Sequence, residues 1–129
     1  MNSPFQILAR GKTHAEIHIL GDIGQSWDEE SITAKKFVEQ LQQIEASTLA
    51  VRINSAGGSV PDGLAIFNAL RRHPATVAVH VEGVAASIAS LIAMAGDSVE
   101  IAANALLMIH APWTATAGNA GILRETADP

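Results

Sequence analysis

A strand, a helix and a second strand follow one another in residues 49–82, which read LAVRINSAGGSVPDGLAIFNALRRHPATVAVHVE. The two ends of this unit, Leu49–Asn54 and Thr76–Glu82, are short runs rich in apolar residues, as is typical of strands. Between them Ser59 begins a helix, with Asp62 three residues later as a partial capping box. This order predicts two parallel strands joined by a right-handed crossover.

The same alternation continues on both sides of this unit. Towards the N-terminus, Ala15–Leu20 alternates apolar and polar residues like a strand, and Ile32–Ile44 has the apolar face of an amphipathic helix. Towards the C-terminus the pattern predicts a buried helix, two short strands and a last helix, namely Ser87–Ala95, Val99–Ile101, Leu106–Ile109 and Gly118–Asp128. We therefore predict an α/β fold with a largely parallel sheet, as a single domain over residues 1–129.

The composition excludes several classes of function. The chain has 129 residues, of which 48% are hydrophobic and 16% charged, so one domain with a substantial core is expected. The formal net charge is -5 and no basic stripe occurs, which argues against nucleic acid or an anionic membrane as a partner. There is no cysteine, so thiolate catalysis and Cys-bound metals are excluded. Neither a secretory signal nor an apolar run of ~20 residues is visible, and a cytoplasmic location is expected.

The carboxyl ends of parallel strands are where α/β proteins place their sites. Three segments follow predicted strands and should therefore lie together: Asn54–Gly58, Gly83–Ser87 and His110–Trp113. Ser87 would begin a helix, where free backbone N–H groups and the helix dipole stabilise an oxyanion beside a serine nucleophile. An ordinary N-cap serine fits the same position, and the G-x-S-x-G motif of α/β-hydrolases is absent.

His110 ends an apolar strand and is followed by Pro112, so it is expected at a strand tip that faces the cleft. A neutral imidazole there could accept the proton of a serine hydroxyl and pass it to a leaving amine. The alternative is a half-buried structural histidine. No histidine pair shows the i, i+4 spacing of a helical zinc site, so no metal is expected.

The glycine-rich loop Ser55–Gly58 joins a strand to a helix. Glycines let a backbone approach a ligand closely and present its N–H groups. The loop could supply an oxyanion donor or bind a phosphate, or it could be a plain tight turn. It lacks the Lys and Ser/Thr of a P-loop, and it lacks the G-x-G-x-x-G pattern.

Taken together, these segments resemble the proteolytic subunit of the Clp protease family. The matches are INSAGG at residues 53–58, GVAASIAS at residues 83–90 and MIHAP at residues 108–112, in the order of the family. The resemblance covers about Ile17 to the C-terminus. The phrases MAGD, NALLMIHAP and AGNAGILRETAD are similar to the phage head-maturation branch of that family.

The resemblance implies a Clp protease/crotonase-like fold of repeated β-β-α or βαβ units and a serine endopeptidase without cofactor or metal. Its nucleophile follows two alanines, which is Ser87 here, and its general base is the histidine of M-I-H-x-P, which is His110. The remaining assignments are oxyanion donors at the backbone N–H groups of Gly57 and Ile88, and substrate binding by Gly58 and Ser59.

The resemblance also implies partners. The substrate would be an unfolded or extended polypeptide bound as an added strand. In the family the subunits form stacked heptameric rings, so a homo-oligomer is expected. A separate ATPase unfoldase would supply unfolding, because this chain has no P-loop, and the phage-like phrases would point to capsid or scaffold proteins.

The sequence departs from the family at several positions. Ala56 replaces a proline and Ala89 replaces a glycine, and neither change removes a catalytic group. The triad aspartate of the family lies beyond a long helix and a further strand, whereas this chain ends at Pro129; Asp97 and Asp128 are poor substitutes. An orienting aspartate can be worth ~10⁴ in kcat. We therefore expect the N-terminal part of such a protease, with weak or no activity and with ring formation impaired.

Three alternatives remain open. A crotonase-type acyl-CoA enzyme has a related fold and two backbone N–H donors, but no catalytic serine. A non-catalytic assembly subunit of the same fold would explain the missing aspartate. Within the protease reading, Ser90 lies three residues after Ser87 on the same side of the helix and could be the nucleophile instead. Ser87 is preferred because it begins the helix.

Overall fold

The computed structural model describes residues 5–9, 13–24, 33–111 and 117–127. Within these ranges the strands are β1 (Phe5–Ala9), β2 (His14–Leu20), β3 (Thr48–Ser55), β4 (Thr76–Ala86), β5 (Ser98–Ile101) and β6 (Leu106–Met108). The helices are α1 (Ala34–Leu41), α2 (Val60–Arg72), α3 (Ile88–Ala93) and α4 (Ala120–Ala127).

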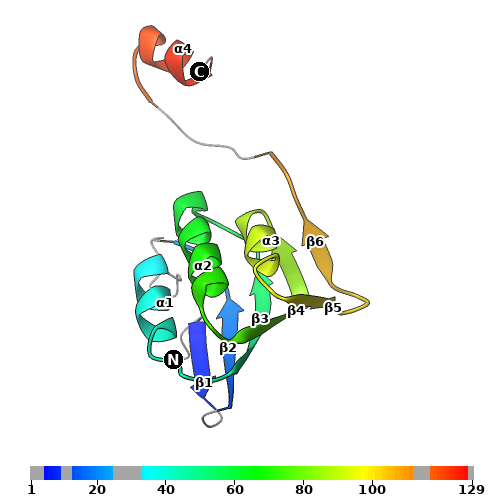
Figure 1. Ribbon diagram of the computed structural model, residues 1–129. Helices are drawn as coiled ribbons and strands as arrows, with labels where there is room; N and C mark the ends of the chain where they lie inside the picture. Colours follow the sequence, from blue (N-terminus) through cyan, green and yellow to red (C-terminus); the bar gives the residue numbers. More distant parts are fainter. Residues whose placement is uncertain (1–4, 10–12, 25–32, 112–116, 128–129) are drawn as a thin grey trace.

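One sheet holds all of these strands, in the order β1-β2-β3-β4-β5, with β6 also paired to β4 (Figure 1). Strands β2 to β6 pair in parallel, whereas β1 pairs antiparallel with β2. The predicted α/β fold with a largely parallel sheet is therefore confirmed. The antiparallel strand β1 was not predicted from the sequence.

Helices α1, α2 and α3 cover one face of the sheet, and the core lies between the two layers (Figure 1). Alternate residues of β2, β3 and β4 point into this core, as the period of two in a strand requires. Its large, fully buried side chains are Ile17, Ile19, Leu49, Val51, Ile53, Val77 and Val79 from the strands, and Phe37, Ile66, Leu70 and Ile92 from the helices.

Helices α2 and α3 pack closely because α2 carries a glycine at their contact. A Cβ on Gly63 would lie 2.2 Å from Cγ1 of Ile88, so no larger residue fits there without movement. At the start of α2 the Ser59 hydroxyl accepts a hydrogen bond from the Asp62 N–H, as the capping pattern predicts. These contacts fix α3, and with it the end of β4, against the core.

Strand β4 is longer than the sequence indicates. The predicted end of this strand at Glu82 is wrong, because β4 continues to Ala86. The added residues Val84–Ala86 pair in parallel with Leu106–Met108 of β6, which extends the strand. The Oδ1 of Asn54 also accepts a hydrogen bond of 3.1 Å from the Val84 N–H, next to an irregularity in the β3–β4 ladder. A side chain on Gly83 would meet that amide, since a Cβ would lie 2.5 Å from Asn54 Oδ1.

The opposite face of the sheet carries ionisable side chains at matching register positions. From β2 to β5 they are His18, Arg52, His80 and Glu100. The Arg52 guanidinium donates to Glu16 on β2 and, at 2.6 Å, to Glu82 on β4. These two hydrogen bonds raise the pKa of Arg52, and the bond to Glu16 has the larger effect. One cation thus joins three neighbouring strands.

Helix α4 is separate from this two-layer body. None of its residues is buried, and in Figure 1 it lies apart from the sheet. Its N-terminus is capped by Asn119, whose side-chain oxygen accepts a hydrogen bond from the Ile122 N–H. Among the described residues, no helix is long and apolar enough to cross a lipid bilayer.

Candidate active site

Ser87 occupies the turn between β4 and α3 in a strained backbone conformation. Its φ is 56° and its ψ is -128°, and among the described residues it is the only non-glycine with a positive φ. Such a conformation costs about 1–3 kcal/mol and persists only where the surrounding structure enforces it. A serine on a strained turn from strand to helix is also the arrangement of the α/β-hydrolase nucleophile, here without its glycine motif.

The hydroxyl of Ser87 has no structural task in this turn. Ser87 stands at the N-cap position of α3, but its side chain makes no capping hydrogen bond. Its backbone is held instead, because its N–H donates to the Met108 carbonyl of β6 at 2.9 Å. The interpretation of Ser87 as an ordinary N-cap serine is therefore not supported, since its hydroxyl caps no backbone N–H of α3.

The glycine-rich loop lies directly against Ser87. A Cβ on Gly57 would lie 2.7 Å from the Cβ of Ser87, and the φ of Gly57 is 106°, which favours glycine. Ser55 fixes the loop from beneath: its buried hydroxyl donates to the Gly21 carbonyl at 2.7 Å and accepts from the Gly57 N–H at 3.1 Å. The loop is thus a built feature of the site rather than a plain turn.

His110 reaches the same site along β6. The parallel pairing of Ala86 with Met108 sets the ends of β4 and β6 side by side, so that Ser87 and His110 both follow paired strand ends. The His110 side chain is exposed, so the alternative of a half-buried structural histidine is wrong. Within the described residues, no hydrogen bond joins His110 to the Ser87 hydroxyl. Catalytic hydrogen bonds are often long before substrate binds.

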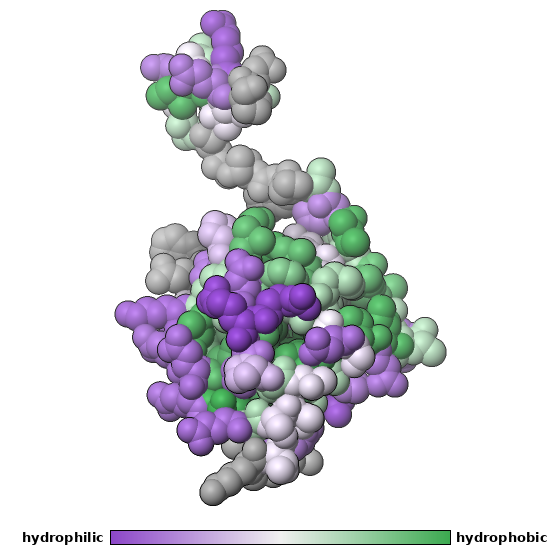
Figure 2. All heavy atoms as spheres, viewed as in Figure 1, coloured by the Kyte–Doolittle hydropathy of each residue, from purple (hydrophilic) through white to green (hydrophobic). Residues whose placement is uncertain are grey.

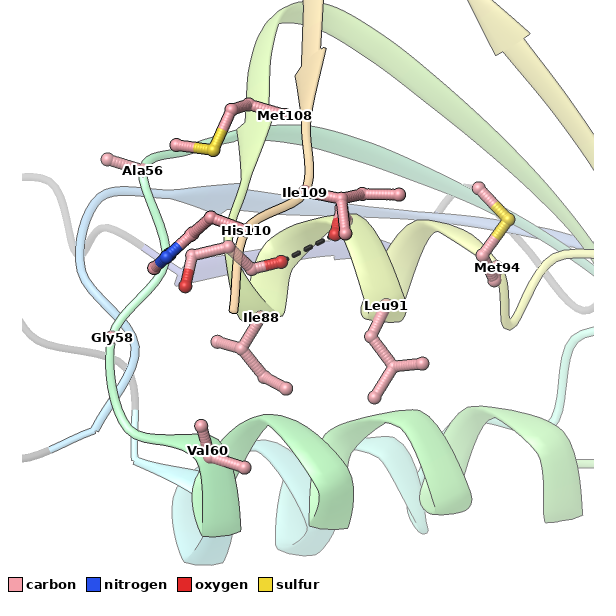
Figure 3. A pocket seen from close by; sticks show the side chains of 11 residues that line it. Ala56, Gly58, Val60, Ile88, Leu91, Met94, Met108, Ile109 and His110 are labelled. Atoms are coloured by element: carbon pink, nitrogen blue, oxygen red, sulfur yellow. Dashed lines mark hydrogen bonds between the residues drawn. The ribbon is translucent and has the colours of Figure 1, made fainter. Parts of the chain in front are cut away.

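Ser87 and His110 line one cavity of about 660 Å³. Its other walls are mostly apolar and come from the loop, α2, α3 and β6 (Figure 3): Ala56, Gly58, Val60, Ile88, Ser90, Leu91, Met94, Met108 and Ile109. Figure 2 shows hydrophobic side chains gathered over the part of the molecule where α3 and β6 lie. The structure therefore places a serine, a histidine and a hydrophobic groove together.

Comparisons with known proteins show the family of the chain. The sequence profile of the family described as Clp protease matches residues 5–128. The chain belongs to the Clp protease family. One relative is the ATP-dependent Clp protease proteolytic subunit 1 of Prochlorococcus marinus (strain MIT 9312), which is 34% identical over 76% of this chain. Another is the ATP-dependent Clp protease proteolytic subunit of Ligilactobacillus salivarius (strain UCC118), which is 35% identical over 74% of this chain.

These alignments cover 53% and 51% of the two relatives. The chain thus spans about half the length of the curated relatives it matches. A subunit 1 of Synechococcus sp. (strain CC9902) gives the same picture, with 33% identity over 76% of this chain and 53% of its own. These relatives are bacterial Clp subunits, and the predicted likeness to the phage head-maturation branch stays a prediction.

The two glycines of the Clp-type loop differ in what their N–H groups do. The Gly57 N–H, predicted as an oxyanion donor, is already bonded to the Ser55 hydroxyl. The Gly58 N–H has no hydrogen-bond partner within the described residues, and Gly58 lines the cavity. The Ile88 N–H is likewise without a partner there. Ser59, predicted to bind substrate, caps α2 and is not among the cavity-lining residues.

Asp97, a poor substitute for the triad aspartate in the sequence, is also far from Ser87 in the structure. Asp97 Oδ2 accepts a hydrogen bond of 2.8 Å from the Val77 N–H at the start of β4, whereas Ser87 follows the end of that strand. The nine residues between Val77 and Ser87 correspond to roughly 30 Å of strand. Asp128, and the residues Pro112 and Trp113 of the predicted cluster, lie outside the described residues.

Other side chains of the cavity were missed from the sequence. Ile88, Leu91 and Met94 recur every three residues after Ser87, so they line one side of α3 and form a wall of the cavity. That spacing was a visible signal for an apolar groove beside the serine. Within the described part of the chain, no group of His, Asp and Glu side chains has a metal-binding arrangement.

Proposed function

We propose that this chain is the serine endopeptidase part of a Clp-type protease, with Ser87 as nucleophile and His110 as general base. One observation carries the proposal: an exposed histidine shares a cavity with a serine whose strained turn leaves its hydroxyl unused. Membership of the Clp protease family supports it.

The reaction would proceed through an acyl-enzyme. The Ser87 hydroxyl oxygen attacks the carbonyl carbon of a peptide bond, and its proton passes to a ring nitrogen of His110. The C–N bond then breaks, and the His110 proton goes to the leaving amine. A water molecule, deprotonated by the same histidine, hydrolyses the ester and restores the serine.

The backbone donors that would stabilise the tetrahedral oxyanion are the N–H groups of Ile88 and Gly58. Both lack a hydrogen-bond partner within the described residues, whereas the Gly57 N–H donates to Ser55. One such donor is typically worth about 3–4 kcal/mol of transition-state stabilisation. In this proposal Gly57 makes room for Ser87 and Gly58 donates.

The substrate would be an extended polypeptide that places an apolar side chain in the groove beside Ser87. Val60, Leu91 and Met94 supply apolar walls, and the lining bears no charged side chain other than His110 when protonated. Burial of a Leu- or Phe-sized side chain there would contribute about 1.5–3 kcal/mol. An unfolded polypeptide with hydrophobic residues is the class of substrate that this chemistry selects.

The wider setting is proposed from the relatives alone. Their names describe proteolytic subunits of an ATP-dependent protease. A homo-oligomer and a separate ATPase are therefore the partners we propose for the whole protein. Phage capsid or scaffold proteins are the substrates that the phage-like phrases of the sequence would imply.

The test is the mass of the intact 129-residue chain after exposure to an alkyl fluorophosphonate. We expect one adduct on the wild type and on Ser90→Ala, and none on Ser87→Ala. An adduct that survives Ser87→Ala and disappears in Ser90→Ala would make Ser90 the nucleophile. A wild-type chain that stays unmodified under conditions that label a serine protease would contradict the proposal.

A non-catalytic assembly subunit is the second candidate. It is favoured by two observations on the described residues: no hydrogen bond joins Ser87 to His110, and no carboxylate is paired with His110. It predicts stable complexes without labelling or peptide turnover. A crotonase-type enzyme would also resist labelling, and binding of an acyl-CoA would separate it from an inactive subunit.

A further inference from the structure

Ser90 is a buried polar residue directly behind the proposed nucleophile, and the reaction described above gives it no part. It is 6% exposed and belongs to α3. Its hydroxyl donates to the Ser87 carbonyl at 2.5 Å, the contact marked by the dashed line in Figure 3. Its backbone N–H donates to the same carbonyl at 3.0 Å. One oxygen of the nucleophilic residue therefore receives two hydrogen bonds from one neighbour.

This carbonyl belongs to the same peptide unit as the Ile88 N–H. A trans peptide is planar, so its C=O and N–H bonds point in opposite directions. When Ser90 holds the carbonyl toward the body of α3, the Ile88 N–H must point away from it, toward the N-terminal end of the helix where Ser87 stands. The hydrogen bond from Ser90 to the Ser87 carbonyl thus sets the direction of the Ile88 N–H.

The other side of Ser87 is held independently. The Ser87 N–H donates to Met108 of β6, so both peptide units that flank the serine are fixed by hydrogen bonds. A residue with φ of 56° and ψ of -128° would relax toward an ordinary conformation without such restraints. Rotation of the peptide between Ser87 and Ile88 is the relaxation that Ser90 opposes.

We infer that Ser90 is a positioning residue for acyl transfer: its hydroxyl orients the peptide between Ser87 and Ile88 so that the Ile88 N–H faces the developing oxyanion. The inference rests on the proposed function, and it concerns the rate of the chemical step rather than substrate affinity. Ser90 itself touches no reacting atom in this scheme.

A similar local bond, to the carbonyl four residues back rather than three, occurs elsewhere in the chain without such a consequence. In α4 the Thr126 hydroxyl donates to the Ile122 carbonyl at 3.0 Å, one helical turn back. A hydroxyl that bonds to a preceding carbonyl is common in helices. Ser90 differs because the carbonyl that it holds belongs to the strained residue beside the cavity. Thr126 therefore offers a matched control.

The experiment measures inactivation by an alkyl fluorophosphonate as a function of its concentration, which separates kinact from KI. The full chain, Ser90→Ala, Ser90→Thr and Thr126→Ala are compared, together with their thermal unfolding midpoints. We expect Ser90→Ala to lower kinact by about 10-fold to 100-fold, with KI changed by less than about twofold. Ser90→Thr should restore most of kinact because it retains the hydroxyl, and Thr126→Ala should match the wild type.

The outcomes distinguish the two proposals. A wild type that reacts at Ser87 and a Ser90→Ala variant with unchanged kinact would overturn the positioning role alone. A loss in Ser90→Ala that Ser90→Thr does not restore, accompanied by a lower unfolding midpoint in both, would assign Ser90 to packing and also overturn it. A wild type that is not labelled would overturn both the proposed function and this inference.

Discussion

At the scale of single residues, Gly57 stands closer to Ser87 than a residue with a side chain could. Gly57→Ala would place a Cβ 2.7 Å from the Ser87 Cβ and force alanine to a φ of 106°. Either Ser87 or the loop must then move, and displacement of a reacting group by about 1 Å can cost on the order of 100-fold in rate. We expect fluorophosphonate acylation of Gly57→Ala to be slower by at least about 10-fold.

Gly121→Ala is the matched control for that substitution. Gly121 lies in α4 and has no positive φ. A Cβ there would lie 3.4 Å from Asn119 Oδ1, which is an ordinary van der Waals contact. Alanine in a helix is favoured over glycine by up to about 1 kcal/mol, so acylation should be unchanged and helicity slightly raised. Equal acylation rates for the two alanine variants would show that Gly57 does not restrict the site.

The residues of the site could be predicted from strand order, but their hydrogen bonds could not. Ser87 and His110 follow strands, and the rule that sites gather at strand ends places them together. The choice between Gly57 and Gly58 as donor depends on the Ser55 hydroxyl, which occupies one N–H and leaves the other. A local sequence pattern does not reveal which N–H a neighbouring side chain will use.

At the scale of elements, Arg52 connects β2, β3 and β4 on the face of the sheet away from the helices. Glu16 is only 7% exposed, and its carboxylate accepts a hydrogen bond from the Arg52 guanidinium. The substitution Arg52→Leu would remove this cation. Removal of one partner from a largely buried ion pair destabilises the fold, although His18 Nε2 remains 3.5 Å from Glu16 Oε1. We expect a loss of about 2 kcal/mol in unfolding free energy at pH 8, reduced from the 3–5 typical of buried pairs because Arg52 is partly exposed.

The pH dependence of Arg52→Leu follows from the same carboxylate. The Arg52 guanidinium stabilises the ionised form of the carboxylates that it contacts, so the effect of its removal depends on their charge. The loss should therefore be largest where these carboxylates are ionised, and smaller in acid. Urea unfolding at pH 8 and pH 5 checks this, with the more exposed Glu82→Gln as control, which should cost less than about 1 kcal/mol. An equal loss at both pH values would exclude a charge on Glu16 as the cause.

Helices and central strands were predictable because their patterns are local. β3, α2 and β4 have apolar periodicity and capping signals within their own residues. The extension of β4 to Ala86 is different, since it depends on pairing with β6, a strand about 20 residues later in the chain. β1 was also not predictable from a local pattern, because it has only five residues and forms by pairing with β2.

At the scale of the whole molecule, α4 contributes little to the stability of the two-layer body. Its large apolar side chains are exposed, Ile122 by 48% and Leu123 by 42%. We expect the double variant Ile122→Gln, Leu123→Gln to change the unfolding free energy by less than about 0.5 kcal/mol. Ile92→Ala, in the core, should cost about 2–5 kcal/mol in the same urea titration. A clear loss in the α4 variant would mean that this helix packs on the body in solution.

The short strand β6 has a further consequence for when the protein could act. Its three residues are exposed, yet its Met108 carbonyl holds the Ser87 N–H, and His110 follows two residues later. Detachment of this one edge strand therefore separates the proposed pair and releases the serine backbone in a single local opening. In the proposed mechanism, a copy whose β6 is not paired with β4 would therefore hold neither the Ser87 backbone nor the general base in place.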